Sequence, residues 1–242
     1  MSLPVFVHPE LGAATVGASV TLTGDEGRHA AVVRRIRSGE QIELVDGAGI
    51  RLTCLVEDVT KTSLTARVAE VRHESRRAPR ITVVQAIPKG ERAELAVEVL
   101  TEIGVDTIVP WAASRSVGVW RGERATKSLT KWRAAAREAA KQSRRAWFPE
   151  VTEMATTADV AALLDSADLG LVLHEEASVP IAPIADGSSV VLVVGPEGGI
   201  APEELEAFAG AQAVRLGPTV LRTSTAGVAA VAALLSGSAR WS

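Results

Sequence analysis

Apolar and polar residues alternate in short runs along the first 72 residues of the chain. Alternation with a period of two is typical of strands that bury one face. Turn sequences such as Ser38-Gly39 and Asp46-Gly47 separate the runs, which lie at Val20–Leu22, Gln41–Val45, Arg51–Val56 and Leu64–Val71. The pattern predicts a small β-rich barrel or sandwich over residues 1–72, with one helix around Asp25–Arg37.

The hydrophobic period changes after a polar, basic segment, His73–Arg80, which we interpret as a linker. Over residues 81–242 we expect strands at Ile81–Ile87, Thr107–Trp111, Leu169–His174, Val190–Val194 and Ala213–Leu216. Helical patterns alternate with them at Arg92–Ile103, Ser128–Arg145, Ala158–Leu164, Pro202–Ala209 and Thr225–Leu235. Because Val190–Val194 is apolar at every position, both of its faces are expected to be covered. The second domain is therefore predicted to be α/β, with a parallel sheet between helices.

The composition argues against several classes of protein. Hydrophobic residues make up 47% of the 242 residues and charged residues 23%, which is ordinary globular usage. We find no apolar run long enough to cross a membrane and no signal peptide at the N-terminus. A single cysteine, Cys54, allows neither an internal disulfide nor a cysteine-based metal cluster. We expect a cytoplasmic protein with no bound metal.

The charges are separated along the chain. Between Arg115 and Arg145 there are ten Lys or Arg residues against two acids, whereas from Glu150 onwards there are three against twelve. Arg133, Arg137 and Lys141 recur every four residues and would form one stripe on the predicted helix. A basic helix can simply be a solvated face, but a run this long and unrelieved favours binding of a polyanion such as RNA.

Two loops carry candidate chemistry. Gly195-Pro-Glu-Gly-Gly199 follows the most apolar strand, and Leu216-Gly-Pro-Thr-Val-Leu-Arg222 follows the next one. Ligands of open α/β sheets bind at the carboxyl ends of strands, where glycines let the backbone approach them closely. The loop matches neither of two common nucleotide-binding motifs, the P-loop pattern G-x-x-x-x-G-K-S/T and the dinucleotide-binding pattern G-x-G-x-x-G. The carboxylate of Glu197 would also repel a phosphate. A ligand with cationic or hydrogen-bond donor groups suits this loop better.

These loops, taken with other motifs, resemble the RsmE family of SPOUT methyltransferases. The resemblance also rests on Thr101-Glu-Ile-Gly-Val105, Arg115-Ser-Val117 and Glu138-Ala-Ala-Lys-Gln-Ser-Arg144, and in the first domain on Gly27-Arg-His29 and Val33-Arg-Arg35. It implies a PUA-like RNA-binding barrel followed by a SPOUT domain whose C-terminal segment forms a trefoil knot. The chain differs from the usual family sequence at Ser224, where a Glu is usual, and at Ile200, where an aromatic residue is usual.

The resemblance implies that the chain uses S-adenosylmethionine (SAM) to methylate N3 of a uridine, at the position numbered 1498, in 16S ribosomal RNA. It also implies a homodimer that acts on 16S ribosomal RNA or on the small ribosomal subunit. The implied cofactor-binding residues are Leu173, His174, Gly195, Pro196, Glu197, Gly198, Gly199, Ile200, Leu216, Gly217, Val220, Leu221, Arg222, Thr225 and Ala226. The implied RNA-binding residues are Arg28, His29, Arg34, Arg35, Lys89, Arg92, Arg115, Arg137, Lys141, Gln142, Arg144 and Arg145.

For catalysis, Arg222 is the candidate to stabilise the developing uracil oxyanion, with Glu175 or Glu197 as proton acceptor. Methylation at C5 of uracil would need a cysteine thiol to attack the ring. The single cysteine, Cys54, lies in the predicted barrel rather than near the candidate loops, which argues against C5 methylation. Three other readings remain open: a SPOUT methyltransferase acting on another RNA such as a transfer RNA, a non-catalytic RNA-binding protein, and a nucleotide-phosphate enzyme on an ordinary doubly wound sheet.

Overall fold

The computed structural model describes residues 3–90, 92–118, 120–184 and 189–241 of the chain. It divides into two compact units. The first comprises Met1–Arg76 and Ala140–Phe148, and the second comprises Arg77–Ala139 and Pro149–Ser242. Residues 140–148, which the sequence pattern placed in the second domain, therefore pack with the first unit.

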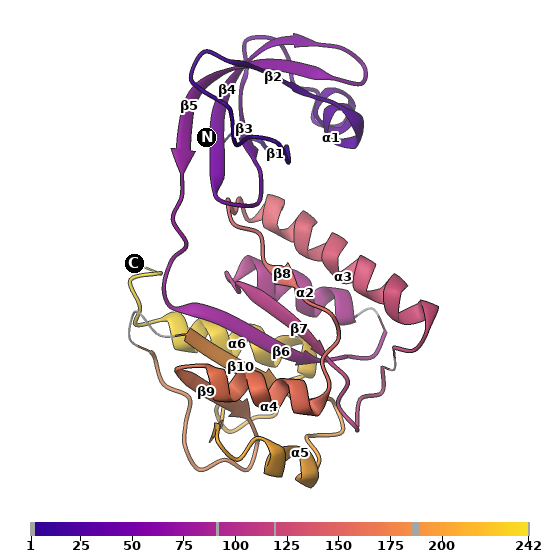
Figure 1. Ribbon diagram of the computed structural model, residues 1–242, viewed down its shortest axis with the longest axis vertical. Helices are drawn as coiled ribbons and strands as arrows, with labels where there is room; N and C mark the ends of the chain where they lie inside the picture. The colour runs from indigo at the N-terminus through magenta and orange to yellow at the C-terminus, as the bar shows by residue number, and fades with distance from the viewer. Residues whose placement is uncertain (1–2, 91, 119, 185–188, 242) are drawn as a thin grey trace. The chain divides into compact units, whose positions relative to one another are not determined.

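The first unit is built on a five-stranded sheet in the order β1-β3-β4-β5-β2 (Figure 1). Only β1 pairs in parallel, with β3. The β4–β5 ladder shifts register twice, and such bulges bend strands and help the sheet to curl. The strands are β1 (Val5–Val7), β2 (Ser19–Leu22), β3 (Gln41–Val45), β4 (Ile50–Val59) and β5 (Leu64–His73).

The helix expected around Asp25–Arg37 is shorter and changes its winding. It begins as the α-helix α1 (Gly24–Arg28) and continues as the π-helical turn η1 (His29–Val33). Gly27 explains the tight packing at this point, because a Cβ atom there would lie 2.6 Å from the carbonyl oxygen of Leu22.

Segment 140–148 is held to the first unit by a buried arginine and two aromatic residues. Arg51 is 8% exposed and donates hydrogen bonds to Glu43, Glu74 and the carbonyl of Arg144, at 2.7, 2.7 and 2.8 Å. Trp147 lies against Gly49 and Phe148 against Gly47, so that glycine is required at both positions of this turn.

The second unit contains a six-stranded parallel sheet in the order β11-β9-β10-β6-β7-β8. Its strands are β6 (Arg80–Ala86), β7 (Thr107–Trp111), β8 (Glu150–Val151), β9 (Leu169–Leu173), β10 (Ser189–Val194) and β11 (Gln212–Val214). Its helices are α2 (Arg92–Glu102), α3 (Glu123–Gln142, whose last turn belongs to the first unit), α4 (Thr157–Ser166), α5 (Pro202–Ala207) and α6 (Thr223–Leu235).

Helices cover both faces of this sheet (Figure 1). One apolar cluster joins the sheet to α2, α3 and α6, and a second joins its other face to α4 and α5. The expectation of a parallel sheet between helices is confirmed. None of the helices in the described part of the chain combines the length and apolar character that a membrane crossing needs.

The C-terminal segment contacts the loop that follows β9 at two places. The backbone of Arg215 exchanges hydrogen bonds with Val179 and Ile181, at 2.8 and 2.9 Å. Further along, the amide of Ile184 donates to the carbonyl of Leu234 near the end of α6, at 3.0 Å. The C-terminal knot that the resemblance implies requires the C-terminal segment to pack against this loop, and these hydrogen bonds are contacts of that kind.

Candidate active site

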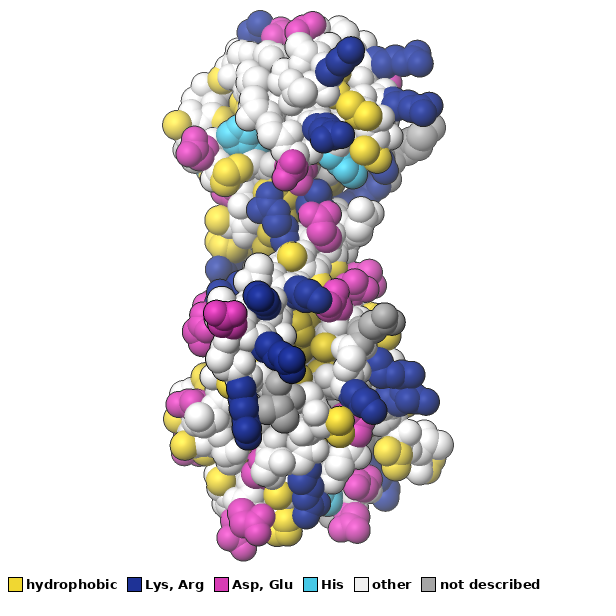
Figure 2. All heavy atoms as spheres, turned by 90° about the vertical axis from the view of Figure 1, so that its right-hand side faces the viewer, with side chains coloured by type: hydrophobic (Ala, Val, Ile, Leu, Met, Phe, Trp, Pro, Cys, Tyr) yellow, Lys and Arg dark blue, Asp and Glu magenta, His cyan; other side chains and the backbone are white. Residues whose placement is uncertain are grey.

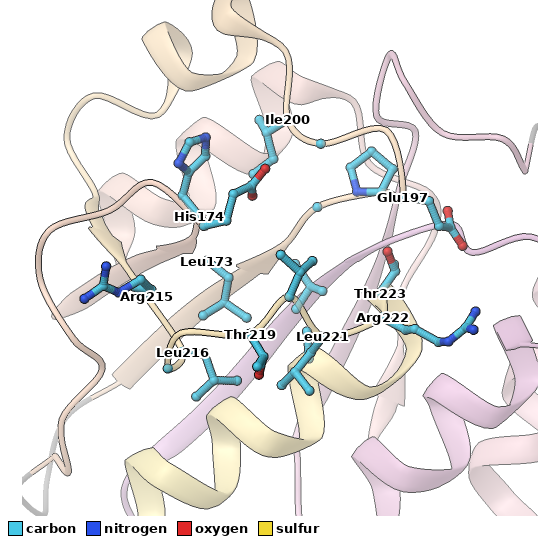
Figure 3. Close-up of a pocket in the computed structure, with 18 of the residues that line it drawn as sticks. Leu173, His174, Glu197, Ile200, Arg215, Leu216, Thr219, Leu221, Arg222 and Thr223 are labelled. Carbon is cyan, nitrogen blue, oxygen red and sulfur yellow. The ribbon is translucent and has the colours of Figure 1, made fainter.

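A cavity of about 330 Å³ opens at the carboxyl ends of β9, β10 and β11 (Figure 3). This volume is within the usual range for small-molecule sites. The three loops that follow these neighbouring strands form its walls. The strands place the cavity because parallel strands present all their carboxyl ends at one edge of the sheet.

The lining contains every predicted cofactor residue except Gly198 and Thr225. The side chain of Thr225 instead donates to the carbonyl of Arg222 at 3.2 Å, within the first turn of α6. The sequence analysis missed five further lining residues, because loop motifs draw attention to glycines and charges rather than to their neighbours: Val194, Arg215, Pro218, Thr219 and Thr223.

Glycines shape the cavity in two ways. A Cβ atom on Gly195 would lie 2.7 Å from Cγ1 of Ile200, and one on Gly198 would lie 3.1 Å from Cβ of Arg115. Both glycines therefore allow protein segments to pack together rather than leave room for a ligand directly. Gly199 and Gly217 have φ angles of +72° and +73°, which residues with a Cβ rarely adopt.

One wall of the cavity is apolar and the rim is charged. Figure 3 shows Leu173, Leu216 and Leu221 gathered on one side. The side chain of Arg222 leads away from these leucines, on the same side of the cavity as Glu197. Arg222 is exposed and occupies the N-cap position of α6. No ion pair joins it to Glu197 among the described residues, and the carboxylate of Glu197 accepts from the amide of Lys89 at 3.3 Å.

Two buried polar side chains hold the surrounding loops. Glu204, 4% exposed, accepts hydrogen bonds from the amides of Ala201 and Ser114 at 2.9 and 2.8 Å. The side-chain amide of Gln85, 1% exposed, donates to the carbonyl of Thr223 at 3.3 Å and so connects β6 to the start of α6. Neither was predicted. The position of Glu204 three residues after Ala201, in the first turn of α5, could have indicated its role.

A second cavity, of about 450 Å³, adjoins the first. The two share His174, Glu175, Glu197, Gly199 and Ile200 as lining residues. Arg115 and Glu176 add charged groups to the second cavity, and the guanidinium of Arg115 donates to the carbonyl of Gly198 at 3.4 Å. Two ligands could therefore meet across the loop that contains Gly198 and Gly199.

Cys54 lies in the apolar core of the first unit and has no exposed surface. Burial raises the pKa of its thiol to about 11, so the thiol stays protonated at neutral pH. It is therefore unsuited to act as a nucleophile. Among the described residues, no group of three or more His, Cys, Asp or Glu side chains is placed to hold a metal ion.

Some of the predicted RNA-binding residues are exposed to solvent, and others are buried or partly buried against neighbouring residues. Lys141 is only 8% exposed and pairs with Glu26 at 2.6 Å, so the structure gives it a packing role that the periodicity of the helix did not reveal. Arg145 and His29 are partly buried, and His29 lies edge-on to Phe6. The remaining predicted residues are exposed: Arg28, Arg34, Arg35, Lys89, Arg92, Arg115, Arg137, Gln142 and Arg144.

The basic stripe on α3 is therefore less uniform than its spacing suggests. Arg133 donates to the carbonyl of Val151 and pairs with Glu153, both at 3.0 Å, whereas Arg137 makes no such contact among the described residues. Figure 2 shows Lys and Arg side chains on the exposed surface of each unit.

Comparisons with known proteins agree with this geometry. A family model described as an RNA methyltransferase domain matches residues 75–235, and one described as an RNA methyltransferase PUA domain matches residues 22–69. The ribosomal RNA small subunit methyltransferase E of Mycobacterium bovis is 50% identical over 233 residues, covering 93% of this chain and 89% of that protein. The chain belongs to the RsmE family.

Further relatives and solved structures extend the likeness. The Bacillus subtilis ribosomal RNA small subunit methyltransferase E is 30% identical over 226 residues and covers 88% of both chains. A Neisseria gonorrhoeae member, solved with bound SAM, superposes with a TM-score of 0.84 at 31% identity, over 96% of both chains. A Legionella pneumophila methyltransferase, also solved with SAM, has a TM-score of 0.85 at 30% identity, over 98% of this chain and 99% of that one. The predicted fold class, a PUA-like domain followed by a SPOUT-type α/β domain, is confirmed.

Proposed function

We propose that this chain transfers a methyl group from SAM to N3 of a uridine, the nucleotide numbered 1498, in the 16S RNA of the small ribosomal subunit. The observation that carries the proposal is the cavity at the ends of β9, β10 and β11, lined by the loops through which the chain resembles the RsmE family. Such a substrate implies a cytoplasmic enzyme.

The residues of the first cavity fit SAM. The leucine wall suits an adenine ring, and Glu197 provides a carboxylate for the cationic part of the molecule. Gly199 and Gly217 keep backbone close to the cavity without side chains in the way, since a Cβ atom on either would enter open space. When bound, SAM supplies an electrophilic methyl group on a positively charged sulfur.

The second cavity fits the acceptor base. Methyl transfer is an in-line displacement, so donor and acceptor must lie in adjoining spaces. The shared residue Glu175 offers a carboxylate to take the N3 proton. Arg222 lines the first cavity only, on the same side as Glu197, which lines both cavities, and its proposed role is to stabilise negative charge on the uracil oxygens. We assign Arg222 and Glu175 to catalysis on these grounds.

The substrate and the assembly state belong to the same proposal. We expect a homodimer, because the family resemblance implies one and because Val220 and Leu221 at the cavity rim are 82% and 39% exposed. Sedimentation equilibrium should then give a molecular mass twice the chain mass of 25.3 kDa. A related enzyme acting on transfer RNA, and an RNA-binding protein that has lost catalysis, are the two competing functions.

Calorimetry and a transfer assay test the proposal together. The purified protein should bind SAM, and with methyl-labelled SAM it should label unmodified 16S ribosomal RNA or small subunits, but not transfer RNA. Glu175→Gln should slow the transfer while SAM still binds. Gly12→Ala is the matched control, because a Cβ atom there meets nothing within 4 Å. Absence of SAM binding would contradict the enzyme, and label confined to transfer RNA would contradict the substrate.

A further inference from the structure

The loop that follows β7 lies against the glycine-rich loop of the candidate site. We call residues 112–118 the β7 loop and residues 195–199 the glycine loop. The guanidinium of Arg115 donates to the carbonyl of Gly198 at 3.4 Å, and a Cβ atom on Gly198 would lie 3.1 Å from Cβ of Arg115. Both residues line the second cavity. The width of this cavity therefore depends on how closely the two loops are held together.

One buried carboxylate connects the two loops. Oε1 of Glu204 accepts from the amide of Ser114, in the β7 loop, at 2.8 Å. Oε2 of Glu204 accepts from the amide of Ala201, two residues beyond the glycine loop, at 2.9 Å. The hydroxyl of Thr157, at the start of α4, donates to Oε1 as well, at 3.4 Å. Each oxygen of this side chain thus holds a different loop of the second cavity.

Capping of α5 alone does not require a buried glutamate. Glu204 is the third residue of α5 and accepts from Ala201 at the N-cap, as in a capping box. In α4 of the same chain, an aspartate does this work, because Asp159 accepts from the amide of Thr156 at 2.8 Å. Asp159 is one methylene shorter and exposed, whereas Glu204 is 4% exposed. The hydrogen bond to Ser114 accounts for the extra length and for the burial.

Hydrogen bonds rather than a cation compensate the buried charge of Glu204. In the part of the chain that the structure describes, no Lys, Arg or His side chain forms an ion pair with Glu204. A buried charge is costly unless hydrogen bonds satisfy it, and backbone amides that donate to a carboxylate form strong ones. Because the two amides belong to different segments, the carboxylate is satisfied only when both segments are in place. Its burial therefore fixes the distance between the two loops.

We propose that Glu204 is a positioning residue for methyl transfer, whose two oxygens hold the β7 loop against the glycine loop and thereby fix the acceptor base in the second cavity. Glu204 lines neither cavity, so it acts through the loops rather than by contact with a substrate. Transfer needs close alignment of donor and acceptor, and a misplacement of about 1 Å can slow a reaction on the order of a hundredfold. The inference rests on the proposed function, because it takes the second cavity as the acceptor site.

Glu204→Asp separates the two hydrogen bonds. An aspartate can cap α5 as Asp159 caps α4, but it lacks the methylene that reaches Ser114. We expect this variant to bind SAM within about twofold of the original and to transfer the methyl group, at saturating SAM and RNA, on the order of tenfold more slowly. In hydrogen–deuterium exchange, residues 112–118 should exchange faster, because the amide of Ser114 has lost its acceptor. Glu203→Asp is the matched control, since Glu203 is the exposed neighbour in the same helical turn.

Glu204→Gln provides a second variant of unchanged length. Its side chain has one acceptor oxygen in place of two, so one of the two loops loses its hydrogen bond. Exchange of residues 112–118 identifies which loop that is. In both variants we expect the transfer rate to follow the exchange of residues 112–118 and not the unfolding temperature. A merely structural role for Glu204 would instead make the rate follow the unfolding temperature.

Three outcomes would overturn the inference. Unchanged exchange of residues 112–118 in Glu204→Asp would show that the carboxylate does not hold the β7 loop. Faster exchange with an unchanged transfer rate would show that transfer does not depend on this loop. A rate that recovers at saturating SAM would assign Glu204 to the cofactor site. If the original chain transfers no methyl group to RNA, the proposed function fails and the role in transfer with it, whereas the exchange measurement still decides whether Glu204 holds the loop.

Discussion

Arg222 is the residue on which the proposed chemistry most depends. It caps α6 at the cavity rim, and no ion pair with Glu197 holds it in the described structure. Loss of a hydrogen-bond donor to a developing oxyanion costs on the order of 3 kcal/mol, or a hundredfold in rate. We therefore expect Arg222→Ala to slow single-turnover methylation about a hundredfold and to weaken SAM binding only modestly.

The lysine variant sharpens this expectation. Arg222→Lys should recover the rate only in part, because an ammonium lacks the planar fork of a guanidinium. The competing role for Arg222 is to brace the loop before α6. In that case, Arg222→Ala would lose thermal stability and SAM affinity together, and saturating SAM would restore the rate. Measurement of both quantities on one preparation distinguishes the two roles.

Gly195 shows how a single atom can define the cavity. A side chain at this position would meet Ile200, whose Cγ1 lies 2.7 Å from the ideal Cβ position. Gly195→Val should therefore displace the loop and weaken SAM binding at least tenfold, on the order of 1.4 kcal/mol. Titration calorimetry on the folded variant measures this, with Gly12→Ala as control. SAM affinity within twofold of the original would remove this loop from the site.

At the scale of elements, helices and strands could be predicted from the sequence where they are long enough to show a hydrophobic pattern. Thr107–Trp111 was predicted with its observed bounds, because four apolar residues in succession after a turn are distinctive. The strands β1 and β8 have three and two residues and are too short to show a period. The break in the helix at η1 could not be predicted either, since the close approach of Gly27 to Leu22 and Thr62 involves residues distant in the sequence.

The helix α3 combines structural and exposed cations that look alike in the sequence. Arg133 and Lys141 pair with Glu153 and Glu26, whereas Arg137 is exposed and pairs with no carboxylate among the described residues. We expect Arg137→Glu to weaken binding of 16S ribosomal RNA severalfold and flatten its salt dependence, because a phosphate contact releases counterions. Arg133→Gln is the control and should affect stability more than RNA binding. An unchanged salt slope in Arg137→Glu would make α3 an ordinary solvated helix.

The end of the chain is fixed by a buried ion pair. Arg240 donates to both carboxylate oxygens of Asp106 and to the carbonyls of Pro79 and Gly104, and the side chains of Arg240 and Asp106 are 10% and 8% exposed. Removal of Arg240 leaves the buried carboxylate of Asp106 with Arg80, at 3.5 Å, as its remaining cationic partner, and loss of a close buried partner typically costs about 3 kcal/mol or more. Arg240→Met should lower the free energy of unfolding by that amount in a denaturant titration. A change under about 0.5 kcal/mol, the usual range for exposed sites, would contradict the assignment.

At the scale of the whole molecule, the division into units differs from a simple order of two domains along the chain. Segment 140–148 returns to the first unit through contacts of Arg51, Trp147 and Phe148 that no local pattern announces. The same limit applies to the knot, because hydrophobic periodicity does not encode how a chain is threaded. Only the resemblance of the loops to the RsmE family indicated that topology.

The cavity residues were easier to foresee than the first unit's surface. Glycines and an arginine after consecutive strands indicated a ligand site, because the geometry of parallel sheets brings such loops together. The positive φ angles of Arg35 and Arg144, +53° and +57°, could not be predicted, because glycine is the residue that usually indicates this backbone conformation in a sequence. Charge alone therefore located the basic regions but could not say which cations are engaged within the protein.

Mass spectrometry of nucleosides from 16S ribosomal RNA tests the central claim most directly. Ribosomal RNA from the parent strain, from a strain lacking the gene and from one complemented with the original or Arg222→Ala chain would be digested and compared. We expect N3-methyluridine to disappear on deletion, to return with the original chain and to return weakly with Arg222→Ala. Unchanged N3-methyluridine in 16S RNA, with a methylated nucleoside lost from transfer RNA instead, would contradict the account.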